Sequence, residues 1–272
     1  MVSTSAQISA AIPNDHARQI DAYDLLSPLV GNEPLRFLDL GAGDGRSFDR
    51  IRKLRPLVDW VGLDIADSPE VLSRTRTDCT FLTYDGTTIP FPDESFDVVF
   101  SRQVFEHVRY PEPVLSEIRR VLRPRGSFIG SVSQLEPYHS RSFWNFTYVG
   151  FATIAAEAGL RPIELRPGID GLTLILRNFA LFGTKTGKRE FFSRYLKTAS
   201  PLNLLIDALF QQEAITESER REIDKLKTFM SSSFPEDIFV PRTSPPASYS
   251  IRDINRLKLR YAGHVCFCFT RD

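Results

Sequence analysis

The residues of this chain that are spaced for chemistry begin with a glycine-rich turn. Gly41, Gly43 and Gly45 follow the apolar run LRFLDL. Glycines there let the backbone turn sharply and approach a ligand closely, while the helix that follows offers unpaired N–H groups. Asp64 and Asp85 end the next two apolar runs, where a carboxylate can accept hydrogen bonds from ribose hydroxyls. Together these residues predict a crevice for an adenosine.

The spacing of the glycines argues against a dinucleotide site. The fingerprint G-x-G-x-x-G requires glycine at position 46, where this chain has Arg46, so its pattern is G-x-G-x-G. A nicotinamide-dependent oxidoreductase is therefore disfavoured, and the adenosine is expected to carry no pyrophosphate. Two alternatives stay open: the glycines form a tight turn without a ligand, or Asp64 and Asp85 cap the helices that follow them.

Two histidines are candidates for a general base, because imidazole exchanges a proton near neutral pH. His139 lies in LEPYHSRSFWNFT after the fifth predicted strand and is the stronger candidate, since loops at that edge of a parallel sheet cover the ligand. His107, in FEHV, has packing or capping as its alternative role. Cys266 and Cys268 have no partners at metal-ligand spacing, so no metal site and metal-independent chemistry are predicted.

An α/β fold must position these residues. Short apolar runs alternate with helical patterns, and parallel strands need connections of that length to return across a sheet. The first five predicted strands are 35–40, 58–64, 79–85, 96–101 and 126–133. The pattern predicts a doubly wound, Rossmann-like sheet that is mostly parallel, with an antiparallel last strand in HVCFCFTRD.

Four segments are expected along the chain. Residues 1–33 are interpreted as an irregular tail followed by one helix, and 34–183 as the core. Near the end of the core we expect a helix capped by Thr147 and closed by Gly159, a sixth strand in RPIELRP and a helix over 171–183. Residues 184–250 are predicted to form a polar helical insertion, and 251–272 a last strand that completes the core sheet.

Composition narrows the classes of partner. The 272 residues include 34 Lys and Arg against 34 Asp and Glu, so the net charge supplies no field for a nucleic acid or an anionic membrane surface. The first residues lack the pattern of a secretory signal, and no apolar run approaches the roughly 18 residues of a membrane span. The three cysteines are expected to be reduced thiols of a cytoplasmic protein.

A series of motifs, in order, carries a family resemblance. FLDLGAGDG, VGLDIAD, YDGTTIPFPDESFDVVFS, EHV and EIRRVLRPRG resemble the class I S-adenosylmethionine-dependent methyltransferases, in particular their small-molecule-type methyltransferase domain. The resemblance covers residues from about 35 to 165. It implies S-adenosyl-L-methionine as cofactor and a seven-stranded sheet whose last strand is antiparallel. The long polar insertion departs from the family core, so the resemblance does not extend to the acceptor.

The resemblance also implies roles for individual residues. The methionine end of the cofactor would be lined by Asp39, Gly41, Ala42 and Gly43. Asp64 would hold the ribose, Ile65 would pack on the adenine, and Asp85 with the Gly86 backbone would meet the adenine amino group. Ser101, Arg102 and Gln103 occupy the family position beside the cofactor that often faces the substrate.

The sequence therefore predicts a methyltransferase acting on a small-molecule or glycan-precursor acceptor, by O- or N-methylation without a metal. A base at His139 or His107 would matter for a hydroxyl acceptor and less for an amine. The alternative is a catalytically inactive methyltransferase-like binding or scaffold protein. The insertion is expected to act as a lid over the acceptor or as the interface of a homodimer.

Overall fold

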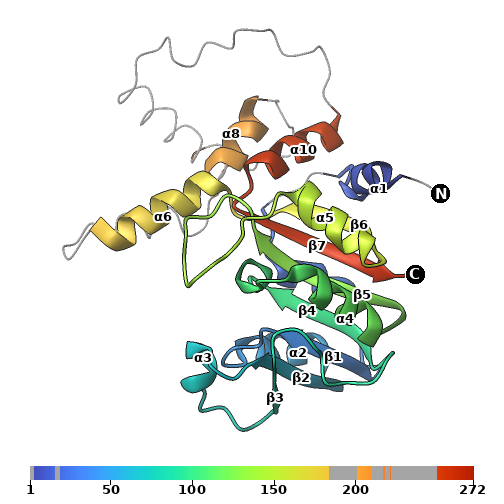
Figure 1. Ribbon diagram of the computed structural model, residues 1–272. Coiled ribbons are helices and arrows are strands. Elements are labelled where there is room, and N and C mark those ends of the chain that lie inside the picture. Colours follow the sequence, from blue (N-terminus) through green and yellow to red (C-terminus); the bar gives the residue numbers. More distant parts are fainter. Residues whose placement is uncertain (1–2, 16–18, 184–200, 210–216, 218–220, 222–249) are drawn as a thin grey trace.

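A seven-stranded sheet forms the centre of the molecule, in the order β3-β2-β1-β4-β5-β7-β6 (Figure 1). The computed structural model describes residues 3–15, 19–183, 201–209, 217, 221 and 250–272. The strands are β1 (Leu35–Leu40), β2 (Val58–Ile65), β3 (Thr80–Tyr84), β4 (Phe96–Arg102), β5 (Leu122–Ser133), β6 (Leu160–Pro167) and β7 (His264–Arg271). The β1–β2, β1–β4, β2–β3 and β4–β5 pairs are parallel, whereas β7 pairs antiparallel with both β5 and β6. The predicted fold class and the antiparallel last strand are confirmed.

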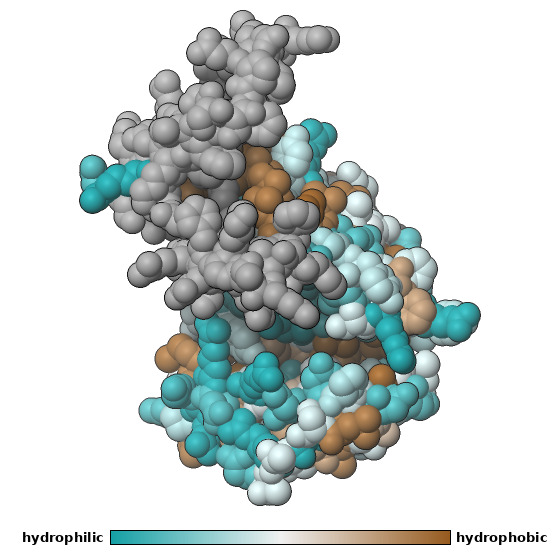
Figure 2. Space-filling view, turned by 90° about the vertical axis from the view of Figure 1, so that its left-hand side faces the viewer, coloured by the Kyte–Doolittle hydropathy of each residue, from teal (hydrophilic) through white to brown (hydrophobic). Residues whose placement is uncertain are grey.

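The strand order creates a crevice between β1 and β4. The chain builds the sheet outward from β1 to β3 and then returns to place β4 on the other side of β1. Ligands of open α/β sheets bind at such a switch point, outside the carboxyl ends of the strands. Figure 2 looks onto this edge, and its lower half, which holds β1 to β3, is mainly hydrophilic.

Helices cover both faces of the sheet because alternate strand residues point to opposite sides. Leu38 and Val99 belong to one hydrophobic core, whereas their neighbours Phe37 and Val98 belong to the other. The helices are α1 (Thr4–Ala11), α2 (Arg46–Leu54), α3 (Pro69–Leu72), α4 (Pro111–Val121), α5 (Tyr148–Glu157), α6 (Gly171–Gly183), α8 (Pro201–Leu209) and α10 (Ile251–Tyr261), with 3-10 helices η1 (Ala22–Leu29) and η2 (Phe105–His107). The first core gathers side chains from α1, α4, α5 and α10, and the second gathers those from η1 and α2.

Several local predictions are confirmed, including both ends of the helix that Thr147 and Gly159 were expected to bound. Thr147 Oγ1 accepts a hydrogen bond from Gly150 N at 2.9 Å at the start of α5. Gly159, at φ 82°, follows the end of that helix, where the left-handed conformation favours glycine. RPIELRP forms β6, and α6 is a helix as expected.

The two chain ends differ from the expectation. Residues 4–11 form α1 rather than part of an irregular tail, because Ile8 and Ala11 are buried in the first core. The segment before the last strand forms α10, whose first turn carries a capping box between Ser250 and Asp253. Most of the predicted insertion (184–200, 210–216, 218–220 and 222–249) lies outside the described residues, so the division into domains stays a prediction.

The described part of the insertion is α8, which packs against α6 and α10. Lys258 of α10 is fully buried, and its Nζ lies 2.7 Å from Asp207 Oδ1 of α8. This ion pair ties α8 to the helix that leads into β7. Among the residues described, none of the helices has the length and apolar character to cross a membrane.

Candidate active site

Three glycines form the turn between β1 and α2, and their conformation and close packing both favour glycine. Gly41, Gly43 and Gly45 all have positive φ, at 77°, 52° and 82°. A Cβ on Gly41 would lie 2.2 Å from Val104 Cγ2, so this position has no room for a side chain. α2 begins directly after the turn and has no side-chain cap at its N-terminus. Among its first N–H groups, Arg46 N donates to Asp44 Oδ1 at 3.3 Å and Phe48 N donates to the Gly45 carbonyl at 3.1 Å.

Asp64 joins the end of β2 to this turn. Its Oδ2 accepts a hydrogen bond from Gly43 N at 2.7 Å, and its Oδ1 accepts one from Ile65 N at 2.8 Å. Ile65 is 39% exposed, which leaves an apolar surface beside the crevice. A Cβ on Gly86, at the end of β3, would lie 3.6 Å from Ile65 Cγ2. The ends of β2 and β3 thus meet beside the turn.

Asp85 has a different local role. It is exposed, and its Oδ1 accepts hydrogen bonds from Thr87 N at 2.8 Å and Thr88 N at 2.7 Å. These bonds hold the pKa of Asp85 below its usual range. The alternative that Asp85 caps a following helix is wrong, because no helix lies in the described residues between β3 and β4; Asp85 instead caps a turn through Oδ1, and this turn does not need its other oxygen.

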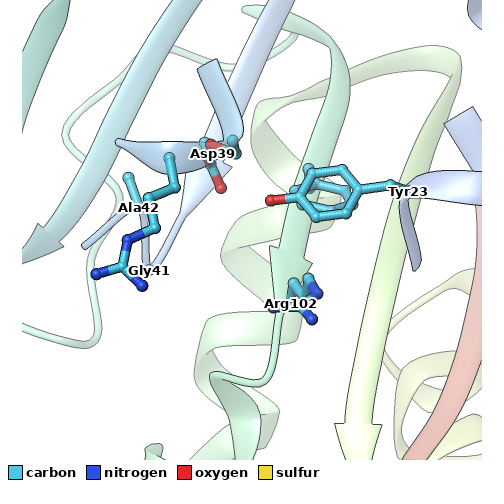
Figure 3. Close-up of a pocket in the computed structure, with 8 residues that line it drawn as sticks. Tyr23, Asp39, Gly41, Ala42 and Arg102 are labelled. Atoms are coloured by element: carbon cyan, nitrogen blue, oxygen red, sulfur yellow. Dashed lines mark hydrogen bonds between the residues drawn. The ribbon is translucent and has the colours of Figure 1, made fainter. Parts of the chain in front are cut away.

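A pocket lies between β1, β4 and η1 (Figure 3). It is lined by Tyr23, Asp39, Gly41, Ala42, Arg46, Ser47, Phe100 and Arg102. Asp39 is 3% exposed and accepts a hydrogen bond from the Ser47 hydroxyl. Burial raises the pKa of Asp39 to about 7, and the charge of Asp64 adds to the effect. The pocket therefore holds a carboxyl group that titrates near neutral pH.

The N-terminal segment closes one side of this pocket. Asp21 binds the Arg102 guanidinium through two hydrogen bonds, of 3.1 and 3.0 Å. The Tyr23 ring lies under two guanidinium groups, 4.3 Å from Arg50 and 5.5 Å from Arg102. In Figure 3 the Tyr23 hydroxyl points toward Asp39. Burial raises the pKa of Tyr23 to about 12, so the hydroxyl stays protonated at neutral pH.

Two of the predicted residues at the end of β4 and just after it lie away from the pocket. Ser101 is fully buried in β4, and its Oγ has no hydrogen-bond partner among the described residues. Gln103 turns toward β5, where its side-chain amide lies 3.0 Å from the hydroxyls of Ser131 and Ser133. Arg102, between them, is the residue of this stretch that lines the pocket. Sequence reasoning also missed Tyr23, because nothing in the sequence places η1 beside β4.

A second group of polar side chains, here called the polar cluster, lies at the ends of β4, β5 and β7. Its members are Gln103, Glu106, His107, Ser133, Glu136, His139 and His264. Ser133 Oγ is within hydrogen-bond distance of Gln103, Glu106 and Glu136. His264 Nε2 lies 2.9 Å from Glu136 Oε2, and burial of Glu136 is outweighed by hydrogen bonds and by the charge of His264, which lower its pKa.

The polar cluster brings the two predicted histidines together. The rings of His107 and His139 meet edge to face, with their centroids 5.2 Å apart. Burial lowers the pKa of His107, and the neighbouring His139 lowers it further, so this imidazole favours the neutral form. His139 Nδ1 lies 3.8 Å from Glu136 Oε1. Neutral imidazole beside a carboxylate is an arrangement suited to proton transfer.

Val104 connects the two parts of the site. Its side chain fills the space over Gly41, and Glu106 and His107 follow it in η2. Gln103, Ser140 and Arg141 around the polar cluster have positive φ, at 56°, 41° and 62°. Non-glycine residues in this conformation are strained and gather at functional sites. The glycine turn and the polar cluster are therefore neighbouring parts of one edge.

Comparisons with known proteins agree with this arrangement. Residues 38–130 match the family model described as a methyltransferase domain. A malonyl-(acyl-carrier protein) O-methyltransferase from Methylococcus capsulatus is 30% identical over 154 residues, which are 54% of each chain. A demethylmenaquinone methyltransferase from Renibacterium salmoninarum is 35% identical over 107 residues, 39% of this chain and 44% of that one. The chain thus spans about half the length of the curated relatives it matches.

A solved structure extends the likeness to most of the fold. A protein described as a candidate sarcosine dimethylglycine methyltransferase from Galdieria sulphuraria superposes with a TM-score of 0.52 and 18% identity. The superposition covers 92% of this chain and 83% of that one. At this identity the likeness shows the fold alone.

Proposed function

The chain carries a methyltransferase domain of the class I S-adenosylmethionine-dependent type, and from that premise we propose that it methylates a small-molecule or glycan-precursor acceptor. The proposal rests mainly on the group of residues at the β1–β4 crevice that we call the cradle: the glycine turn, Asp64 and Asp39. Gly41 leaves no room for a side chain, Gly43 N is bound by Asp64, and Asp39 lies buried beside them. Backbone N–H groups and carboxylates at the ends of successive strands suit a ligand that has an adenosine at one end and an amino acid at the other.

The charges of the pocket fit the amino-acid end of S-adenosyl-L-methionine, which carries an ammonium and a carboxylate. Asp39 offers a carboxyl group and Arg102 a guanidinium within the same pocket. The cofactor, when bound, supplies a methyl group on a sulfonium. The residues that would hold it are Asp39, Gly41, Ala42 and Gly43 at the amino-acid end, Asp64 at the ribose, and Ile65, Asp85 and Gly86 at the adenine. Of the three residues that the resemblance placed beside the cofactor, Ser101, Arg102 and Gln103, Arg102 is the one that lines the pocket.

The polar cluster is the proposed acceptor side. Holding a nucleophile in near-attack geometry lowers the barrier by roughly 7–11 kcal/mol, and a positioned base adds a factor of about 10²–10⁴. His139, with Glu136 at 3.8 Å, and His107 are the groups that would accept the proton of a hydroxyl. We favour an oxygen acceptor over nitrogen because these imidazoles lie beside the cradle, and because the Methylococcus relative is named an O-methyltransferase.

The remaining expectations belong to the same proposal. We propose a cytoplasmic enzyme without a nucleic-acid partner, in which the insertion covers the acceptor. A homodimer through the insertion is the competing arrangement. The insertion carries apolar residues that could form such an interface, and three of them, Phe191, Phe192 and Phe210, lie outside the described residues. Leu204 and Leu205 are partly buried on α8, which packs on α6 and α10 of its own chain.

Calorimetric titration with S-adenosylmethionine and S-adenosylhomocysteine tests the proposal. We expect the native chain to bind both, and Asp64→Ala to bind neither measurably. Asp64→Asn retains an oxygen that can accept from Gly43 N and should bind with intermediate affinity. Asp59→Asn is the matched control, because Asp59 lies on the same strand at its other end and pairs with Arg36.

The opposite result has a definite meaning. If the native chain binds neither compound while its unfolding curve shows a folded protein, the chain is not an enzyme of this class as it stands. The methyltransferase-like scaffold then becomes the better account. If the native chain binds both compounds and Asp59→Asn weakens binding as much as Asp64→Ala, the cofactor site is not at the residues proposed here.

A further inference from the structure

We propose that Glu106, His107 and His139 form a binding site for one divalent transition-metal ion. Each residue offers a ligand atom, and the three atoms lie within 4.8 Å of one another. The sequence gives no hint of this site, because His139 is separated from Glu106 and His107 by a helix and a strand. The proposal departs from the expectation of metal-independent chemistry, which rested on spacing alone.

Glu106 is the strongest pointer to a missing cation. The residue is fully buried. Its Oε1 lies 3.0 Å from Ser133 Oγ, whereas its Oε2 has no hydrogen-bond partner among the described residues. A buried carboxylate oxygen without a partner is costly, and a cation is the group that most directly compensates it. Glu106 thus carries an unsatisfied carboxylate oxygen, and its carboxylate lies within 4.8 Å of the ligand atoms of the two imidazoles.

Both imidazoles are arranged as metal ligands usually are. A ligating histidine commonly holds its second ring nitrogen against a backbone carbonyl, which fixes the tautomer and the ring. His139 Nδ1 lies 3.3 Å from the carbonyl oxygen of Pro137, which leaves Nε2 for a metal. His107 Nδ1 is buried without a partner among the described residues, while the ring has a hydrogen bond with the backbone of Arg141.

The loop that carries His139 is fastened to Glu106 itself. Phe143 N and Trp144 N both donate to the backbone carbonyl of Glu106, at 2.7 and 3.2 Å. Ser142 N donates to the carbonyl of His139 at 2.8 Å, and the two residues between them have positive φ. Backbone bonds and a strained turn therefore hold the third ligand over the first two.

The donor set selects the class of cation. Two imidazoles and one carboxylate suit zinc, iron, cobalt or manganese, whereas magnesium and calcium prefer oxygen ligands. Metal–ligand bonds of about 2.0–2.2 Å require the three atoms to approach by roughly 1 Å from their present spacing. Three protein ligands leave a coordination position open for an exchangeable ligand.

The site deepens the proposed function without depending on it. Binding of the ion requires only the three ligands. Its use, which rests on the proposed function, would be to bind an oxygen of the acceptor and lower the pKa of that hydroxyl. The two histidines would then act as ligands rather than as bases.

The test uses the full chain without a histidine tag, stripped of metal with a chelator. Cobalt(II) is titrated by visible absorption and zinc by calorimetry, with no cofactor present. We expect one ion per chain and a cobalt spectrum without thiolate bands. His139→Ala and Glu106→Gln should each weaken binding by about 100-fold or more, beyond the loss of an outer hydrogen-bond partner.

His264→Gln is the matched control, because His264 lies in the same cluster but is not one of the three ligands. It should bind cobalt as the native chain does. The proposal is overturned if the native chain takes up no ion, or if His139→Ala binds as tightly as the native chain. His139→Ala decides the matter if Glu106→Gln fails to fold. Titration of the same samples with S-adenosylhomocysteine tests the proposed function independently. A chain that binds this compound but no metal ion would contradict the metal site alone.

Discussion

The glycine turn and the polar cluster share one edge of the sheet but are built in different ways. The turn consists of consecutive residues whose contribution comes from the backbone, with three glycines at positive φ. Asp64, at the end of β2, accepts a hydrogen bond from Gly43 N. The polar cluster consists of side chains from η2, the ends of β5 and β7, and the loop before α5. The first is therefore defined by local sequence, and the second only by the packing of distant elements.

The difference sets what each region tolerates. A backbone site fails when a side chain is added, because other side chains already fill the space beside the backbone, as Val104 does at Gly41. A side-chain site fails when a hydrogen-bonding group is removed, because its buried partners lose their compensation. Substitutions of each kind should therefore separate the two regions.

Gly41→Ala should give the largest loss. The left-handed φ costs alanine about 1–2 kcal/mol, and a Cβ at 2.2 Å from Val104 Cγ2 adds about 1–3 kcal/mol of overpacking. We expect the free energy of unfolding in urea to fall by about 2–5 kcal/mol, together with loss of S-adenosylhomocysteine binding. Gly86→Ala is the control for the free energy of unfolding only, because Gly86 is itself proposed to contact the adenine. Its φ is 83°, but its nearest new contact is 3.6 Å, so only the conformational cost should appear. If the two variants lose the same free energy of unfolding, the turn has room for a side chain at Gly41.

The same contrast explains what the sequence could predict. The sheet, the Thr147 cap and the positions of Asp39 and Asp64 follow from local patterns, because alternation, caps and strand ends are written in consecutive residues. Tyr23 and Arg102 were not paired in advance, since their contact depends on η1 folding back over β4. The burial of Ser101 and the unpartnered Glu106 oxygen also depend on packing. Residues 4–11 were mistaken for a tail because two buried apolar side chains give too weak a pattern.

Asp39→Asn should change how stability depends on pH. Burial raises the pKa of Asp39 from 3.8 to about 7. Between these two pH values the folded state keeps a proton on Asp39 that the unfolded state has lost. The stabilisation from this proton is complete below the unfolded value and is lost as pH rises through about 7. Relative to the native chain, Asp39→Asn should gain up to about 4 kcal/mol between acid and mildly alkaline pH. Urea unfolding across this range measures it, and Asp59→Asn, an exposed carboxylate, should show no such gain. A flat difference would mean that Asp39 stays ionised.

Ser133→Ala tests the polar cluster separately. Its hydroxyl contacts Glu106 and Glu136, so its removal leaves buried carboxylate oxygens less satisfied and should cost about 1–3 kcal/mol. Cofactor affinity should not change. Ser101→Ala is matched to it, because that buried hydroxyl has no partner among the described residues and its loss should be neutral or stabilising. A cofactor affinity that falls with Ser133→Ala would show that the two regions are coupled through Val104.

Arg102→Met should have the smallest effect on stability and still separate the two regions. The pair with Asp21 is 42% and 38% exposed at its two side chains, and such pairs contribute about 1 kcal/mol or less. If Arg102 binds the cofactor carboxylate, its loss removes a charged hydrogen bond worth about 1.5–3 kcal/mol, which is roughly a 10-fold or greater loss of S-adenosylhomocysteine affinity. Arg50→Met is the control, because Arg50 also lies over Tyr23 but does not line the pocket. Affinity that falls equally in both variants would assign the effect to the Tyr23 ring. Affinity unchanged by Arg102→Met would leave Asp39 and the backbone of the turn as the amino-acid site, without a basic side chain.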